Sequence, residues 1–192
     1  MRPIVLAVVG LPGAGKTEAS EYIVKKTNWG HVHFGNIVTV DEIKKRGLEL
    51  NEENERMIRE DLRAKGGMGV LAAMSLPKIK ELFATSSVLI ESHYSWEEYI
   101  ILKDAFGDDF RVLALFASPE TRAARMAKRP HRPLTAEEFR SRDYSQIANL
   151  HQAGPIARAD WMIINEGTVA ELQKNIDQVL AKVQQISDAG EN

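Results

Sequence analysis

Short apolar runs alternate with longer segments of helical spacing along the whole chain. The apolar runs are rich in Val, Ile and Leu and are bounded by polar residues or glycine. They cover residues 4–9, 31–34, 87–91, 110–116 and 161–165. A continuous apolar run indicates a strand that is covered on both faces, as in a parallel sheet. The pattern therefore predicts a parallel sheet of about five strands.

Residues typical of helix starts stand between these runs. The sequence Ser/Thr-x-x-Glu, which caps a helix reciprocally, begins at Ser95, Thr135 and Thr168. Ser118 precedes a proline that suits the first helical position, and Asn51 can cap the polar helix after it. The alternation of strands and helices predicts a three-layer α/β/α fold.

Two segments are longer than this alternation needs. Residues 35–85 are mostly helical, contain a Gly-rich stretch at 66–69, and include Pro77, which we expect to break or start a helix. Residues 122–150 are rich in Arg. Because long inserts on such a core commonly bind or cover a substrate, we interpret 35–85 as an acceptor-binding arm and 122–150 as a lid. Both belong to one domain over residues 1–192, and a purely structural role is the alternative for the arm.

Composition excludes several kinds of chemistry. The chain has no cysteine, which excludes disulfides, Cys-ligated zinc and thiol catalysis, and which fits a cytoplasmic protein. The net charge of −2 gives no global field that attracts nucleic acid. No apolar stretch approaches the roughly 20 residues of a membrane span. We therefore expect a small-molecule partner, with no membrane or nucleic-acid partner, and a homodimer is possible.

The strongest chemical signal follows the first apolar run. Residues Gly10–Thr17 read G-x-x-x-x-G-K-T between a strand and a helix, the setting of a phosphate-binding loop, so we expect the α/β/α fold to be of the P-loop NTPase kind. Its glycines let backbone N–H groups turn toward a polyphosphate, and the helix N-terminus adds to the attraction. Lys16 can reach the β- and γ-phosphates, and the Thr17 hydroxyl can ligate Mg²⁺. The residues expected to bind ATP here are Gly10, Gly13, Ala14, Gly15, Lys16, Thr17 and Glu18.

Two further sets of polar residues accompany the loop. Glu91 ends the run at 87–91, where the topology places an acidic group beside the loop. It can hold Mg²⁺ through water or accept a proton from an attacking hydroxyl, so we predict it as a metal and catalytic residue. Arg125 and Arg129 share a helix face and can neutralise charge on a transferring phosphoryl group. A solvated basic face is the alternative for the arginines.

The order of these motifs resembles the archaeal nucleotide-kinase-like P-loop proteins, which are similar to adenylate kinases and dephospho-CoA kinases. Besides the loop, the matching segments are 35–38, 45–49, 90–91, 117–122, 142–143 and 159–167. The resemblance implies a kinase core with ATP and Mg²⁺ as cofactors. It further implies that Lys16, Thr17, Arg125 and Arg129 handle phosphates and metal, and that Asn165 and Glu166 lie near the donor base.

The chain departs from that family at two positions that would hold the phosphate of the acceptor. Thr39 and Tyr94 stand where the related kinases tend to carry Arg. Burying a phosphate without cationic partners is costly. Three outcomes fit the departure: the acceptor is a neutral hydroxyl compound, other arginines replace the lost pair, or phosphoryl transfer has decayed and ATP binding serves regulation.

The sequence as a whole predicts an ATP-dependent phosphotransferase. Its acceptor would be a small molecule such as a nucleoside, a nucleotide or dephospho-CoA. The alternative is a nucleotide-dependent binding module with little or no kinase activity, in which ATP sets the conformation of the arm and lid for a partner to recognise.

Overall fold

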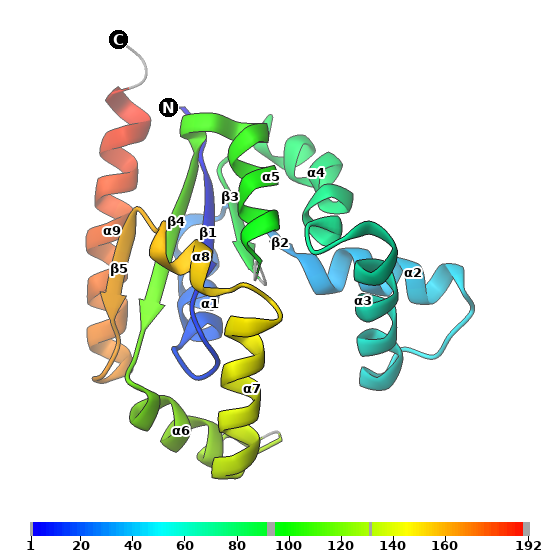
Figure 1. The fold of residues 1–192 in the computed structure, drawn as a ribbon. Coiled ribbons are helices and arrows are strands. Elements are labelled where there is room, and N and C mark those ends of the chain that lie inside the picture. Colours follow the sequence, from blue (N-terminus) through cyan, green and yellow to red (C-terminus); the bar gives the residue numbers. More distant parts are fainter. Residues whose placement is uncertain (1, 92–94, 131, 190–192) are drawn as a thin grey trace.

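A parallel sheet forms the centre of the computed structural model, which describes residues 2–91, 95–130 and 132–189. The strand order is β2-β3-β1-β4-β5, and every neighbouring pair is parallel (Figure 1). The strands are β1 (Val5–Val9), β2 (Gly30–His33), β3 (Val88–Glu91), β4 (Phe110–Phe116) and β5 (Trp161–Ile164). The predicted α/β/α fold with a parallel sheet of about five strands is confirmed.

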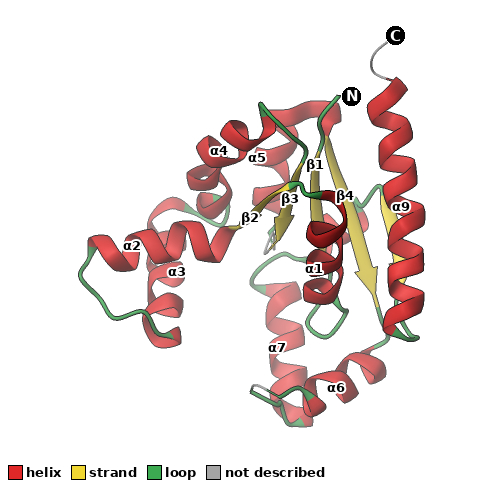
Figure 2. Ribbon diagram, turned by 180° about the vertical axis from the view of Figure 1, so that it is seen from behind, coloured by secondary structure: helices red, strands yellow, loops and turns green. Residues whose placement is uncertain are grey.

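Helices cover both faces of this sheet. Helices α1 and α9 lie on one face (Figure 2), and α4, α5 and α8 lie on the other (Figure 1). The bounds of these helices are α1 (Lys16–Thr27), α4 (Val70–Phe83), α5 (Trp96–Phe106), α8 (Ala153–Ala157) and α9 (Val169–Ala189), with a short 3₁₀ turn η2 (Gly107–Asp109) after α5. Within the described residues, no helix has the length and apolar character needed to cross a membrane.

The apolar character of β1 on both faces follows from this arrangement. Alternate residues of a strand point to opposite faces. Val5, Ala7 and Val9 enter a core shared with α4 and α5, whereas Leu6 and Val8 enter a second core shared with α1 and α9. All five side chains are fully buried. The central strand therefore presents its carboxyl end, and the loop that follows it, from a rigid layer.

The arm connects the adjacent strands β2 and β3 through a π-helical turn and three helices. These are η1 (Gly35–Thr39), α2 (Val40–Lys45), α3 (Glu52–Gly66) and then α4. Helices α2 and α3 stand to one side of the sheet, whereas α4 packs on it (Figure 1). Gly67, with φ of +78°, ends α3 and allows the chain to turn into α4.

The expectation that Pro77 breaks or starts a helix is wrong, because α4 runs through it from Val70 to Phe83. Proline removes one backbone hydrogen bond from a helix and clashes with the preceding turn, which is costly in isolation. Leu71, Ala72 and Ile79 on the same helix are almost completely buried in the core between α4, α5 and the sheet. Their burial offsets the lost hydrogen bond, so tertiary packing overrides the local preference.

The lid lies beyond the carboxyl ends of the strands. It contains most of α6 (Pro119–Lys128) and the whole of α7 (Ala136–Ala148), both below the sheet in Figure 1. The predicted helix starts are confirmed, since the side chains of Asn51, Ser95, Ser118, Thr135 and Thr168 each accept a backbone N–H from the third residue after them.

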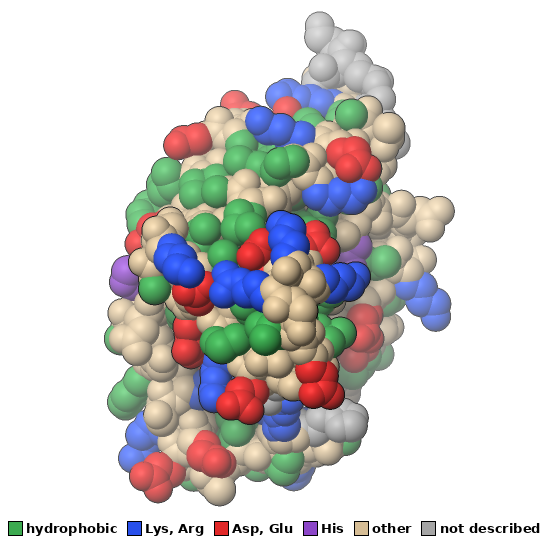
Figure 3. Space-filling model, turned by 90° about the vertical axis from the view of Figure 1, so that its right-hand side faces the viewer, with side chains coloured by type: hydrophobic (Ala, Val, Ile, Leu, Met, Phe, Trp, Pro, Cys, Tyr) green, Lys and Arg blue, Asp and Glu red, His purple; other side chains and the backbone are tan. Residues whose placement is uncertain are grey.

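The outer surface of the arm carries charges of both signs. Figure 3, which looks onto the arm end of the molecule, shows Lys and Arg side chains interleaved with Asp and Glu. Asp61 pairs with Arg46 at 2.7 Å and with Lys65 at 2.8 Å, and Lys45 pairs with Glu42 at 2.9 Å. The positive charges on this outer surface are therefore largely neutralised within the arm itself.

The reciprocal cap at the start of α7 gives a test of the fold. Replacing Thr135 by Ala removes the acceptor for the Glu138 N–H, so we expect the free energy of unfolding to fall by about 1 kcal/mol in urea denaturation. The exposed Ser141→Ala change in the middle of α7 is the control, and it should alter stability by less than about 0.5 kcal/mol. Equal effects of the two changes would show that the cap does not stabilise α7.

Candidate active site

The loop between β1 and α1 turns in a way that only glycine permits at two positions. Gly13 has φ of +82° and Gly15 has φ of +102°. A Cβ at Gly13 would lie 2.8 Å from the carbonyl oxygen of Arg122, and a Cβ at Gly15 would lie 2.4 Å from Nδ2 of Asn165. Larger residues are therefore excluded both by backbone strain and by contact with the elements behind the loop.

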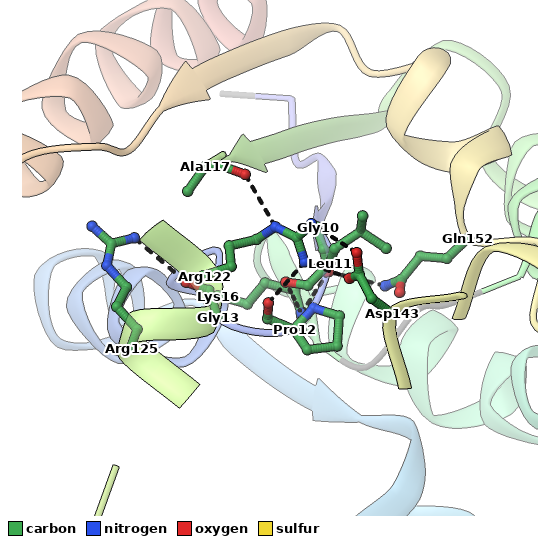
Figure 4. Close-up of polar contacts among 10 residues, drawn as sticks. All are labelled: Gly10, Leu11, Pro12, Gly13, Lys16, Ala117, Arg122, Arg125, Asp143 and Gln152. Atoms are coloured by element: carbon green, nitrogen blue, oxygen red, sulfur yellow. Dashed lines mark hydrogen bonds and ion pairs between the residues drawn. The ribbon is translucent and has the colours of Figure 1, made fainter. Parts of the chain in front are cut away.

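Side chains from distant elements bind the carbonyl oxygens of the loop, and Figure 4 shows most of these contacts. The Gly10 carbonyl accepts from Lys16 Nζ at 2.5 Å and from Gln152 Nε2 at 3.0 Å. The other bonds run from Arg122 Nη1 to Pro12 (3.3 Å), from Arg125 Nη1 to Gly13 (3.4 Å) and from Asn165 Nδ2 to Ala14 (2.9 Å). With the carbonyls held in this way, the first N–H groups of α1, which lack partners inside the helix, remain for an anion.

A buried ion pair anchors the lid to the back of the loop. Arg122 is 3% exposed and Asp143 is 7% exposed. The guanidinium binds both carboxylate oxygens, with Nη2 at 2.9 Å from Oδ2, and its Nε donates to the Ala117 carbonyl at 3.0 Å (Figure 4). A bidentate pair of this kind fixes orientation as well as distance. Arg122 therefore belongs to the framework of the loop, and Arg125 and Arg129 lie farther along the lid.

A pocket of about 830 Å³ opens in front of the loop. Its lining contains eight of the predicted site residues, namely Gly13, Gly15, Lys16, Thr17, Glu18, Glu91, Arg125 and Arg129. Gly10, Ala14 and Asn165 do not line it. The side chains of Ala14 and Asn165 are buried on the side of the loop away from the pocket, and the Asn165 amide donates a hydrogen bond to the Ala14 carbonyl. His93 and Tyr94 lie outside the described residues.

Lys16 is the best-placed cation for a polyphosphate in this pocket. Its ammonium group bonds to the Gly10 carbonyl and, at 3.3 Å, to the Leu11 carbonyl. The pKa of Lys16 is lowered from 10.5 to about 8, mainly by burial; Glu91 opposes this shift, and the positive charges of Arg142 and Arg122 contribute to it. An anion bound beside Lys16 would compensate for the water that the buried side chain has lost. It would raise the pKa of Lys16 and so favour the protonated form.

Glu91 faces the same pocket from the end of β3, the strand next to β1. Its carboxylate lies 3.3 Å from Nε2 of His31. His33, two residues after His31 on the neighbouring strand β2, lines the pocket too, and burial lowers its pKa below the usual value. The Glu91 carboxylate is chemically able to accept a proton or to order a metal-bound water. No cluster of three or more metal-binding His, Cys, Asp or Glu side chains occurs in the described part of the chain.

A second pocket of about 400 Å³ adjoins the first and lies between α3 and α7. His33, Arg142 and Gln146 line both pockets. At its other side it is lined by Arg59 and Arg63 of α3. The loop end and the arm end of the site are therefore connected through shared side chains. A further opening of about 490 Å³ lies between Arg125 and the Glu166–Gly167 turn.

Sequence reasoning missed several residues of this site. Arg59 and Arg63 were overlooked, although their spacing of four on one polar helix was a usable signal. Arg142 and His33 were not among the predicted site residues either. Gln152, which is fully buried and bonds Gly10 from 142 residues away, left no local pattern that could have revealed it.

Comparison with known proteins supports the kinase-like fold. A family model described as an AAA domain matches residues 9–141. The UPF0200 protein of Thermococcus sibiricus is 30% identical over 184 residues, covering 94% of this chain and 95% of that protein. A gluconokinase from Sinorhizobium meliloti 1021 superposes with a TM-score of 0.64 at 14% identity over 100% of this chain and 99% of that one. A shikimate kinase from Bacteroides thetaiotaomicron does so with 0.60 at 10% identity over 93% and 98%. At such identities the structural likeness establishes the fold alone.

The buried pair can be tested by a double-mutant cycle. Asp143→Leu leaves the Arg122 charge buried without its partner, so we expect a loss of about 3–5 kcal/mol in the free energy of unfolding. The combined Arg122→Met and Asp143→Leu variant should lose clearly less than the sum of the two single variants, because neither charge is then stranded. Additive losses in urea denaturation would contradict a coupled pair.

The lowered pKa of Lys16 predicts proton uptake when a polyphosphate binds. At pH 9, one unit above the pKa of about 8, about 90% of the free protein carries neutral Lys16. Phosphates favour the ammonium form, so ATP binding should take up close to one proton, measured as a buffer-dependent binding enthalpy in calorimetry. The Lys16→Arg variant, whose side chain stays charged, is the control and should take up none at this position. A binding enthalpy of the wild type that does not depend on the buffer would contradict the assignment.

Proposed function

This chain belongs to the UPF0200 family and carries a P-loop domain of the nucleotide-kinase-like type, and from that premise we propose that it transfers the γ-phosphoryl group of ATP to a hydroxyl of a small molecule. The observation that carries the proposal is the connection of two pockets. The one beside Lys16, Thr17 and Glu91 opens into the one beside the arm through shared side chains. A phosphoryl donor and an acceptor can therefore meet without leaving the protein. We place the reaction in the cytoplasm.

The residues of the loop fit a triphosphate. Three features support this fit. Gly13 and Gly15 have positive φ and leave no room for a Cβ atom, and side chains hold the carbonyl groups of the loop. The Lys16 ammonium group at the N-terminus of α1 is buried away from water. The Thr17 hydroxyl and, through water, Glu91 would hold Mg²⁺. When bound, the metal supplies neutralising charge to the β- and γ-phosphates. The base would lie in the opening between Arg125 and the Glu166–Gly167 turn.

The chemistry then follows from the positions of the chain's own groups. The acceptor hydroxyl oxygen forms a bond to the γ-phosphorus while the bond from that phosphorus to the β,γ-bridging oxygen breaks, and ADP leaves. Glu91 takes the hydroxyl proton, and His31 at 3.3 Å stabilises its carboxylate. Lys16, Arg125 and Arg129 stabilise the charge on the moving phosphoryl group. The lid excludes water, which prevents simple hydrolysis.

The Lys16→Ala variant tests this proposal. The wild type should form ADP together with a phosphorylated product when a set of nucleosides, nucleotides and sugar acids is offered with ATP and Mg²⁺, as detected by mass spectrometry. Lys16→Ala should lower kcat/KM by about 10²–10³-fold or more with an unchanged circular dichroism spectrum. Lys25→Ala, an exposed change on the same helix, is the matched control and should behave as the wild type.

Two results would contradict the proposal. Full activity of Lys16→Ala would exclude the loop as the phosphate site. Slow ADP formation by the wild type without any phosphorylated product would favour the alternative, a nucleotide-dependent binding module.

A further inference from the structure

We infer that the acceptor binds as an anion, with a phosphate or carboxylate group held by Arg59 and Arg63 of α3 and facing Arg142 of α7. This inference rests on the proposed phosphotransferase function and narrows its substrate class. Of the three outcomes that the sequence left open, it selects the one in which other arginines take over from the two that related kinases tend to carry at the positions of Thr39 and Tyr94.

The pocket between α3 and α7 concentrates positive charge. Four of its lining side chains are arginines, and Glu55 is its one carboxylate among the described residues. Glu55 lies 3.3 Å from Arg59 at the exposed edge of α3. The chain as a whole carries a net charge of −2, so this concentration is local. A surface of this kind attracts an acidic ligand into a confined space.

Arg63 is held in this pocket without enough acceptors of its own. Its side chain is only 15% exposed, and the nearest carboxylate oxygen in an ion pair, from Glu98, is 4.0 Å away. Its Nε is buried and has no hydrogen-bond partner within the described chain. A buried guanidinium N–H without an acceptor costs free energy, and an oxyanion of a ligand can supply that acceptor.

The cations on the outer surface of the arm differ from those of the pocket in their carboxylate partners. There Arg46, Lys45 and Lys65 each have a carboxylate within 2.9 Å. Arg142, by contrast, lines the pocket and makes no ion pair or hydrogen bond with another described residue. Arg59 and Arg63 are four residues apart on one helix face, where like charges repel. In the pocket, Arg59 has only Glu55, at 3.3 Å, and Arg63 and Arg142 have no carboxylate closer than 4.0 Å among the described residues, so these cations can still bind an acidic ligand.

The position of the arginines fits an acceptor that spans the site. Thr39, where the related kinases tend to carry Arg, is the last residue of η1, is fully buried and carries no charge. Arg59 and Arg63 approach from α3 instead. His33, Arg142 and Gln146 connect their pocket to the one that contains Lys16. An acceptor with an anionic group at α3 can thus present a hydroxyl group, at its other end, to the γ-phosphate near Glu91.

The test uses three forms of one sugar: ribose, ribonate and ribose 5-phosphate. Each is titrated into the full chain by calorimetry with saturating ADP and Mg²⁺, so that the loop is occupied. We expect ribonate or ribose 5-phosphate to bind at least tenfold more tightly than ribose, and the preferred one identifies the oxyanion as carboxylate or phosphate. The Arg59→Ala/Arg63→Ala variant should lose about 10- to 100-fold of that affinity, as loss of charged hydrogen bonds implies. Arg140→Ala, an exposed change on α7 outside the pocket, should lose none.

Arg59→Ala alone serves as a second variant, because Arg63 lies near the buried Glu98 and its loss can disturb folding. Ribose binding as tightly as both anions, no binding by either anion, or unchanged anion affinity in the arginine variants would overturn the inference. Failure of the wild type to bind ATP in a separate titration would instead overturn the proposed function. The sugar titrations therefore test the inference, and the ATP titration tests the proposed function.

Discussion

The site depends on the way five consecutive carbonyl groups of the loop are held from behind. A backbone that turns its N–H groups toward a polyphosphate must turn carbonyls away, and buried carbonyls need donors. Here the donors come from α1, from α6, from the residue before α8 and from the residue after β5. The Leu11 carbonyl accepts a hydrogen bond from the Ala14 N–H within the loop. The loop is therefore shaped by the whole fold, although its sequence is local.

The same requirement explains why the lid is tied to the core at its start. Arg122 donates both to the loop and to Asp143 of α7, so the position of α7 and the shape of the loop are coupled through one guanidinium. A displacement of α7 would disturb the loop, and a ligand that organises the loop would favour the present position of α7. Because α7 also carries Arg142, the pocket toward the arm is linked to the phosphate end by the same helix.

The parts that the sequence predicts are those that depend on neighbours along the chain. The loop motif, the helix caps and the strands are local patterns, and Glu91 follows from the rule that places an acidic group at the end of a neighbouring parallel strand. Pro77 was misjudged because its cost is offset by the burial of Leu71 and Ile79, which only the packed fold shows. Gln152 and Arg63 were missed because they act on residues that folding brings close from other elements. The substitution at Thr39 was visible in the sequence, whereas the arginines of α3, which we propose as its replacement, gave no signal of that role.

The most direct measurement of the central claim is a crystal structure with Mg²⁺ and a non-hydrolysable ATP analogue. The account predicts that the triphosphate lies against the backbone N–H groups of residues 13–17. It also predicts that Lys16 Nζ leaves the Gly10 carbonyl for the β- and γ-phosphates, while Gln152 stays bound to Gly10. A nucleotide bound elsewhere, or a Lys16 ammonium still on Gly10 beside a bound triphosphate, would contradict it.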